Sequence, residues 1–401
     1  MDRMNVAIVG TGFVAEFYGN TLDQHPELHL VGAYDRNPGN LSAFCRRWPV
    51  RAYASLTEML KDPSVDMVLN LTNPRSHFEV SARCLEAGKH TYSEKPLAMD
   101  SGQASELVAL ARRRGVYLAS APCSVLSETA QTVWKAVVDN AVGRVRLVYA
   151  NFDEGMIAPN FTPWNMINGC GVPWPAKDEF EVGCTYEHAG YVLTWLAAFF
   201  GPAKTVTSFS SCQIPDKGIP VDKMAPDFSV GCIEYDNGIV ARVTCGLVAP
   251  LDKSLTIIGE TGIIYTSTVR NEPNPVYVQH IPPYRRLTGI IERRINRVRG
   301  WAQSCLPITL TTGDDWHIRR KYPFARRPTR LVAGVDKPVD FNRGPAELAE
   351  AVRQRRPCRL SGELGLHIVE LLEALQYPER FGGRRRIDST FHPIQPLSWI
   401  S

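Results

Sequence analysis

A glycine-rich turn close to the N-terminus constrains the fold of this chain more than any other feature. It follows a short apolar run at residues 5–9 (NVAIV) and comprises Gly10, Thr11, Gly12, Phe13, Val14 and Ala15. Gly10 permits a tight turn, Gly12 lets the backbone approach a pyrophosphate, and Ala15 keeps the next helix close to the strand. The start of that helix offers free N–H groups and a positive dipole. The pattern therefore predicts a dinucleotide site.

The second apolar run, residues 28–34 (LHLVGAY), ends at Asp35 and Arg36. A carboxylate at this place accepts hydrogen bonds from both ribose hydroxyls and repels a 2′-phosphate, so Asp35 favours NAD over NADP. Arg36 weakens that preference, because a guanidinium there can pair with a 2′-phosphate. We expect NAD as the cofactor, with NADP as the alternative.

Strands and helices keep alternating up to about residue 121. We expect strands at 65–71, 89–92 and 116–121, and helices at 56–60, 77–87 and 101–114. This order predicts an α/β fold with a doubly wound parallel sheet, a Rossmann domain over residues 1–123. Ligands bind at the carboxyl ends of such strands, which selects two further cofactor-binding loops. These loops contain Thr72, Asn73, Pro74 and His77, and Glu94, Lys95 and Pro96.

Lys95 is the first candidate for a catalytic group. A lysine at the end of this strand would point toward the nicotinamide end of the crevice. Partial burial lowers the pKa of a lysine, which would suit Lys95 to polarise a carbonyl or to share a proton. We expect Glu94 to hold the Lys95 ammonium in place.

The sequence Glu94-Lys95-Pro96 after a fourth strand, preceded by a T-x-P-x-x-H loop, resembles the glucose–fructose oxidoreductase/inositol dehydrogenase (Gfo/Idh/MocA) family. The resemblance covers nearly the whole chain, including the segment around His188 and the closing segment 340–370. It implies a C-terminal α+β domain with an open, mostly antiparallel sheet over residues 124–401, and a homo-oligomer formed through that sheet. It also implies oxidation or reduction of a hydroxyl-bearing carbon in a sugar, cyclitol or sugar derivative.

The pattern along the second half agrees with a sheet. Polar and apolar residues alternate at 144–153, 204–210, 228–235, 239–245 and 255–258. Asp236-Asn237-Gly238 between two of these runs predicts a hairpin. An antiparallel sheet commonly has one face covered by helices, and the apolar run at 181–200 is the expected covering helix.

His188 stands at the front of that predicted helix. In the family that the chain resembles, the helix begins with an Asp, and a His four residues later acts with the Lys of E-K-P. His188 falls on that His, and Cys184 falls where the Asp would be. Zinc is not expected, because other ligands at suitable spacing are missing, and hydride transfer needs no thiol nucleophile. We predict that His188 is the acid–base group and that Lys95 polarises the reacting oxygen.

Several further residues are candidates for substrate contacts. Glu187 could supply the missing carboxylate, but its helix face differs from that of His188 by about 100°, so we expect it to contact substrate. Cys184 and Asp153 are also assigned to the substrate site. The loop at 164–178 is rich in Trp, Pro and Gly, and Trp164 and Trp174 could stack on a sugar face.

The segment 283–330 is a basic insertion with eleven arginines and one lysine against three acids. Apolar residues recur within it at helical spacing, which predicts a basic amphipathic helix. An arm between subunits or a solvated insertion is the favoured interpretation, and a membrane surface is the less favoured one. Nucleic acid is not expected, because no binding motif accompanies the charge.

Ten cysteines without a C-x-x-C pair are typical of the reducing cytosol. No signal peptide is recognisable, and no apolar run reaches the ~20 residues that span a bilayer, so we expect a cytoplasmic protein. The favoured function is an NAD(P)-dependent sugar or polyol dehydrogenase. The alternatives are a glycosidase or lyase that uses NAD for transient oxidation, and a non-catalytic NAD-sensing regulator. The presence of Lys95 and His188 argues against the regulator.

Overall fold

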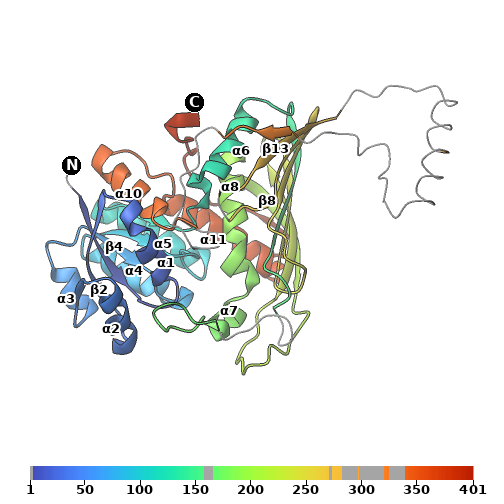
Figure 1. Ribbon diagram of the computed structural model, residues 1–401. Coiled ribbons are helices and arrows are strands. Elements are labelled where there is room, and N and C mark those ends of the chain that lie inside the picture. Colours follow the sequence, from blue (N-terminus) through green and yellow to red (C-terminus); the bar gives the residue numbers. More distant parts are fainter. Residues whose placement is uncertain are drawn as a thin grey trace.

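The computed structural model describes residues 3–157, 166–270, 273–281, 297, 320–324 and 339–400. They form two β-sheets with helices between them (Figure 1). Trp164 and most of the basic segment 283–330, including its predicted helix, lie outside the described residues. Among the described residues, no helix combines the length and the apolar character needed to cross a bilayer.

The first sheet is parallel and has the strand order β3-β2-β1-β4-β5-β6. Its strands are β1 (Met4–Val9), β2 (Leu28–Tyr34), β3 (Arg51–Ala52), β4 (Met67–Asn70), β5 (His90–Ser93) and β6 (Leu118–Ser120). This is the order of a Rossmann fold, and β1 lies between β2 and β4 at the point where the order reverses. The glycine turn after β1 therefore opens into the crevice where ligands bind in such folds.

Helices cover this first sheet, and short polar residues cap three of them. They are α1 (Ala15–Thr21), α2 (Pro38–Arg47), α3 (Leu56–Lys61), α4 (His77–Glu86) and α5 (Ser101–Arg114). The side chains of Asn37, Ser55 and Asp100 accept hydrogen bonds from backbone N–H groups in the first turns of α2, α3 and α5. These caps satisfy donors that a helix start leaves without an internal partner.

The second sheet has nine strands in the order β14-β13-β12-β11-β7-β10-β9-β8-β15. They are β7 (Val145–Asp153), β8 (Ala203–Ser211), β9 (Phe228–Tyr235), β10 (Val240–Gly246), β11 (Leu255–Gly259), β12 (Gly262–Thr266), β13 (Val276–His280), β14 (Arg320–Tyr322) and β15 (Arg384–Arg386). The predicted hairpin joins β9 to β10, with Gly238 at a φ of 81°. The sheet is mixed because β10 pairs in parallel with β7.

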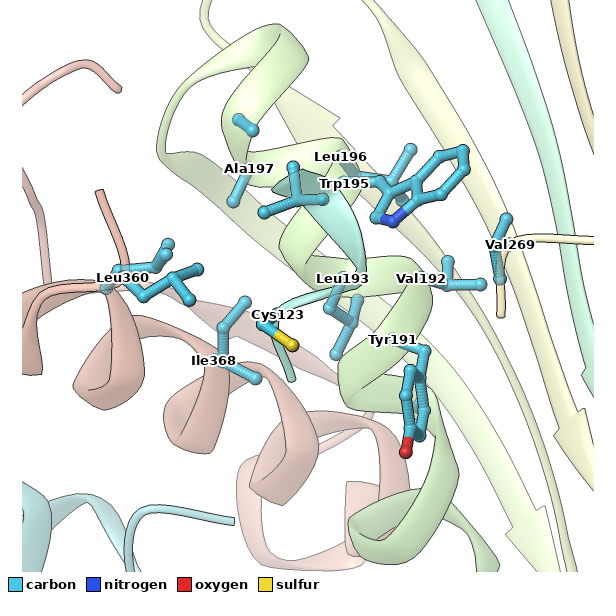
Figure 2. Packing of buried hydrophobic residues seen from close by; sticks show 14 of the residues in the cluster. Cys123, Tyr191, Val192, Leu193, Trp195, Leu196, Ala197, Val269, Leu360 and Ile368 are labelled. Atoms are coloured by element: carbon cyan, nitrogen blue, oxygen red, sulfur yellow. The ribbon is translucent and has the colours of Figure 1, made fainter. Parts of the chain in front are cut away.

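A helix layer fills the space between the two sheets. It includes α6 (Glu128–Val138), α8 (Gly190–Phe200) and α11 (Gly362–Gln376), whereas α10 (Arg343–Gln354) packs against β2, β5 and β6 of the first sheet. Most side chains of α8 are buried, and Figure 2 shows it between Ile368 of α11 and Val269. Trp195 of α8 is 1% exposed, and its indole N–H donates to Ser124 Oγ at 2.9 Å. This apolar layer holds the two sheets together.

The prediction of one covering helix over 181–200 is wrong. A separate helix, α7 (Ala176–Val182), ends at Gly183, which has a φ of 98°. A π-helical turn over Thr185–Ala189 then leads into α8. A Cβ on Gly183 would lie 2.6 Å from the side-chain oxygen of Gln376, so close packing against α11 adds to the need for glycine at this break.

Candidate active site

A cavity of 590 Å³ lies at the carboxyl ends of the first sheet. Of the residues selected from the sequence, it is lined by Gly10, Gly12, Phe13, Val14, Asp35, Arg36, Thr72, Asn73, Pro74, His77, Glu94, Lys95, Trp174, Glu187 and His188. The structure thus brings the predicted cofactor loops and the segment around His188 to one place. Thr11, Asp153 and Cys184 do not line this cavity.

The glycine turn leaves space for a ligand on one side only. Gly10 has a φ of 93°, and a Cβ there would lie 2.7 Å from the backbone oxygen of Leu71. A Cβ on Gly12 would meet nothing within 4 Å. Gly10 is therefore required by the packing of β1 on β4, whereas the backbone of Gly12 borders open space. This is the cradle that a pyrophosphate needs, so the turn fits a dinucleotide.

Asp35 lies directly after β2 and is tied to the glycine turn. Its Oδ2 accepts from the backbone N–H of Thr11 at 2.6 Å and from Thr11 Oγ1 at 3.0 Å. Its Oδ1 accepts from the Asn37 N–H at 2.7 Å. Thr11 does not line the cavity itself. Its hydrogen bonds fix the Asp35 carboxylate at the cavity wall, which Arg36 also lines.

His77 connects the two predicted cofactor loops. Its Nδ1 lies 2.6 Å from the carbonyl oxygen of Pro96, and its Nε2 lies 2.9 Å from that of Thr72. Burial lowers the pKa of His77. In the first of these loops, the Oδ1 of Asn73 is buried and has no hydrogen-bond partner among the described residues. His77 thus fixes the loop geometry, and Asn73 offers an acceptor that a ligand could satisfy.

Lys95 pairs with a residue other than the one expected. Its ammonium lies 2.5 Å from Glu187 Oε2, while Glu94 accepts from Tyr18 OH at 2.7 Å and from the Lys95 backbone N–H at 2.9 Å. Burial lowers the pKa of Lys95, but Glu187, Tyr191, Glu94 and Glu179 together outweigh burial and raise the pKa above the ordinary value. The expected contact with Glu94 and the expected lowering of the pKa are both wrong, because Glu187 neutralises the buried charge.

His188 lies between two carboxylates. Its Nε2 is 2.6 Å from Glu179 Oε1, and its Nδ1 is 3.4 Å from Glu154 Oε1. Nδ1 is buried and has no hydrogen-bond partner among the described residues. The imidazole stacks on the ring of Phe152, with a centroid distance of 5.7 Å, which fixes its plane.

Glu154 is the anion of a charge cluster beside His188. Its carboxylate accepts from Lys253 Nζ at 2.6 Å and from an Arg270 guanidinium nitrogen at 2.8 Å. Burial raises the pKa of Glu154, but Arg270, His188 and Lys253 together lower it to about 2. Arg270 and Tyr191 also line the cavity. Both were missed in the sequence, because neither belongs to a motif.

Two predicted substrate residues point elsewhere. Cys184 is 0% exposed, and its Sγ lies 3.7 Å from the backbone oxygen of Cys245 on β10. Asp153 is buried, and burial together with the Asp252 charge raises its pKa to about 6. Both side chains lie in the protein interior and do not line the cavity, so the structure does not bring them to the other predicted site residues. Trp174 does line the cavity, with its ring packed edge-on against Phe180.

Residues 166–175 form a strap that crosses to the glycine turn. Asn168 Nδ2 donates to the backbone oxygen of Phe13 at 3.1 Å. The backbone N–H of Cys170 donates to Glu16 Oε2 at 3.2 Å. Farther along the strap, Val172, Pro173, Trp174 and Pro175 line the cavity. The strap therefore fastens the second half of the chain to α1 beside the dinucleotide crevice.

Two protein-family models match this chain. An oxidoreductase-family model with an NAD-binding Rossmann fold matches residues 4–121. A GFO/IDH/MocA C-terminal domain model matches residues 130–265. A mouse trans-1,2-dihydrobenzene-1,2-diol dehydrogenase is 25% identical over 260 residues, which is 64% of this chain and 72% of the relative. An uncharacterized oxidoreductase of Synechocystis is 23% identical, over 78% of this chain and 86% of the relative.

Solved structures share the fold. An aldose-aldose oxidoreductase from Caulobacter crescentus, complexed with glycerol, has a TM-score of 0.71 at 17% identity and covers 96% of this chain and 99% of its own. The WlbA dehydrogenase from Bordetella pertussis, in complex with NADH and UDP-GlcNAcA, has a TM-score of 0.67 at 18% identity and covers 96% of this chain and 98% of its own.

Proposed function

This chain belongs to the GFO/IDH/MocA family of NAD(P)-dependent oxidoreductases, and from that premise we propose that it interconverts a hydroxyl and a carbonyl on a sugar, cyclitol or related diol. One observation carries the proposal. The Lys95–Glu187 pair and the His188 ring line the same cavity as the open backbone of Gly12. A charged donor, a base and a nucleotide cradle are the parts that such a reaction requires.

We assign the cofactor to the part of the cavity with the glycine turn. Gly12 would face the pyrophosphate, Asp35 the adenine-side ribose, and Asn73 a polar group of the dinucleotide. When it is bound, the nicotinamide supplies the hydride acceptor or donor. The unpartnered Asn73 Oδ1 and the open space at Gly12 support this assignment.

Lys95 and His188 divide the work on the substrate oxygen. Lys95 keeps its charge through Glu187 and stabilises negative charge as it develops on that oxygen. His188 takes the hydroxyl proton in oxidation and returns it in reduction, which is the acid–base role that a histidine side chain commonly plays near neutral pH. Both groups act on one oxygen atom, so they must lie on the same side of the cavity.

The substrate class is argued from the cavity wall and from the relatives. The carboxylates of Glu179 and Glu187 can accept hydrogen bonds from substrate hydroxyls, and Trp174 offers an apolar surface to a ring. The mouse relative is named for a cyclic diol, the Caulobacter structure contains glycerol, and the Bordetella structure contains a nucleotide sugar. The cyclic diol and glycerol both have hydroxyl groups on adjacent carbons.

A substrate screen tests the proposal. Sugars, cyclitols, nucleotide sugars and trans-diols are offered with NAD and NADP, and NAD(P)H is followed by its absorbance. At least one polyol should be oxidised, and Lys95→Met should lower kcat by about 10²-fold or more. Lys61→Met, on the exposed end of α3, is the matched control and should behave as the unaltered protein. The absence of any oxidised polyol, or normal turnover by Lys95→Met, would overturn the proposal.

A further inference from the structure

Position 184 is a cysteine, so it supplies no carboxylate to His188. The carboxylate of Glu179 lies next to the His188 ring instead. We infer that Glu179 is the positioning residue of His188: it fixes which ring nitrogen carries the proton and stabilises the ring when it is charged. The inference rests on the proposed function, because it assigns a role within that same site. The carboxylate partner of His188 then comes from the separate helix α7, and not from the helical segment that contains His188.

The distance between the two side chains decides the tautomer. His188 Nε2 lies 2.6 Å from Glu179 Oε1, and both residues are buried. An ionised carboxylate only accepts hydrogen bonds, so Nε2 must carry the proton. Neutral imidazole then has its lone pair on Nδ1, which is the nitrogen without a hydrogen-bond partner among the described residues. Glu179 thus makes Nδ1 the basic atom.

Neighbouring residues are less suited to this role. Glu154 lies 3.4 Å from Nδ1 and already binds Lys253 and Arg270. Glu187 is paired with Lys95 at 2.5 Å. Cys184 turns its sulfur toward Cys245. Within the part of the chain that the structure describes, Glu179 is therefore the carboxylate with a hydrogen bond to His188.

Glu179 is held firmly enough to orient a ring. The Ala225 N–H donates to the backbone oxygen of Phe180 at 2.9 Å and so ties α7 to the loop before β9. Lys217 lies over the Phe180 ring and forms an ion pair with Asp227 at 2.5 Å, with its side chain 0% exposed. Since a buried ion pair fixes this loop, α7 and its carboxylate have little freedom to move.

The chemical consequence concerns the substrate proton. In oxidation the O–H bond of the substrate breaks and an N–H bond forms at Nδ1 of His188, while the hydride on the same carbon would pass to the nicotinamide of the bound cofactor. The imidazolium then faces Glu179 through its Nε2–H and Glu154 through its new Nδ1–H. Glu179 gains no proton, and its charge stabilises the imidazolium throughout. Reduction runs through the same contacts in reverse.

Nitrogen NMR on ¹⁵N-histidine protein, in the absence of substrate, tests the tautomer. The His188 signals are identified by their loss in His188→Asn. In the unaltered protein at high pH, Nε2 should carry the proton. In Glu179→Leu, Glu154 is the carboxylate that remains near the ring, so the proton should move to Nδ1. Glu181→Leu, on the same helix but bound to Arg75, should leave the tautomer unchanged. An unaltered tautomer in Glu179→Leu would overturn the inference.

The pH dependence of turnover gives a second readout that a merely structural role would not move. Glu179→Gln keeps the size of the side chain but removes its charge, so kcat should fall by about 10- to 100-fold. The acidic limb of the pH–rate profile should move to lower pH by about one unit or more, because a neighbouring carboxylate favours the protonated, inactive ring. Glu154, Arg270, Glu187, Lys95 and Tyr191 also face the site and remain in place in this variant.

Cys184→Ser should leave the acidic limb of the pH–rate profile unchanged. A shifted limb in Cys184→Ser together with an unshifted limb in Glu179→Gln would contradict the assignment. The two levels of the argument fail separately. If no polyol is oxidised, the proposed function is wrong, but the NMR experiment still decides whether Glu179 sets the tautomer. If a polyol is oxidised and Glu179→Gln has an unshifted profile, the function stands and the role of Glu179 is refuted.

Discussion

We expect Asp35 to determine the preference for NAD over NADP. Its carboxylate accepts from Thr11 and Asn37 and lines the cavity beside Arg36. In Asp35→Ser, NAD should bind about 10- to 100-fold more weakly, since hydrogen bonds to a charged group contribute about 1.5–3 kcal/mol. NADP should lose less affinity, because a repulsive charge is removed. Titration of both against tryptophan fluorescence measures this, with the exposed Asp23→Ser as the control. An unchanged NAD/NADP ratio would contradict the role of Asp35.

Single residues were predictable where a motif fixes both their type and their place. Lys95 follows the end of β5, and His188 follows α7, and both line the cavity. The partners of these residues were not predictable. Glu187 reaches Lys95 only after segments 92 residues apart have packed together. Glu179 reaches His188 across the helix break at Gly183, which the apolar pattern does not reveal. The sequence contains no periodic signal for such contacts.

At the scale of elements, the strap at residues 166–175 should control the release of the dinucleotide. It donates hydrogen bonds to Phe13 in the glycine turn and to Glu16 in α1, and Glu16 also pairs with Arg47 at 3.1 Å. Asn168→Ala and Glu16→Ala should each speed NADH dissociation several-fold. Each removes one hydrogen bond that contributes about 1 kcal/mol to holding the strap in place. Stopped-flow fluorescence with excess unlabelled NAD gives the rate.

Glu58→Ala is the matched control for the strap, because Glu58 is an acid of the same domain that binds Arg51 and does not line the cavity. It should leave the NADH dissociation rate unchanged. Equal rates in Glu16→Ala, Asn168→Ala and the unaltered protein would show that the strap does not hold the dinucleotide.

Elements with a strong local pattern were predicted well. The strands 28–34 and 228–235 and the helix 101–114 agree residue for residue with β2, β9 and α5. The break at Gly183 was missed, because the apolar pattern runs through it and the contact that requires glycine comes from Gln376 on α11. The parallel pairing of β10 with β7 was missed for a similar reason: strand direction within a sheet depends on connections that alternation does not report.

At the scale of the whole molecule, α11 joins the two halves. It packs against α5 of the Rossmann unit and against β8 of the second sheet, and it lies centrally between them (Figure 1). Ser101 Oγ donates to Glu373 Oε2 at 2.6 Å on one side, and Ser208 Oγ donates to the backbone oxygen of Ala374 at 2.6 Å on the other. Because the cavity is lined by residues from both halves, its geometry depends on this helix.

His367 on α11 makes that junction sensitive to acid. Its Nε2 accepts from the Ala203 N–H at 3.1 Å, and its Nδ1 lies 3.1 Å from the Ser389 carbonyl oxygen. Protonation of Nε2 would break the first bond, and burial lowers the pKa of His367 to about 4. Since the unfolded chain binds this proton near pH 6.5, the unfolded state gains protons first as the pH falls, and stability is lost between about pH 6.5 and pH 4.

The size of this loss follows from the difference between the two pKa values. From pH 7 to pH 5, His367 should remove about 2 kcal/mol from the free energy of unfolding. His367→Gln has no proton to gain, so its loss over the same interval should be smaller by about that amount, even if the variant is less stable at pH 7. Urea unfolding of both proteins at the two pH values measures the difference. Equal losses would mean that His367 is not buried as a neutral ring, and that the junction between α11, β8 and the C-terminal segment is more open than the structure describes.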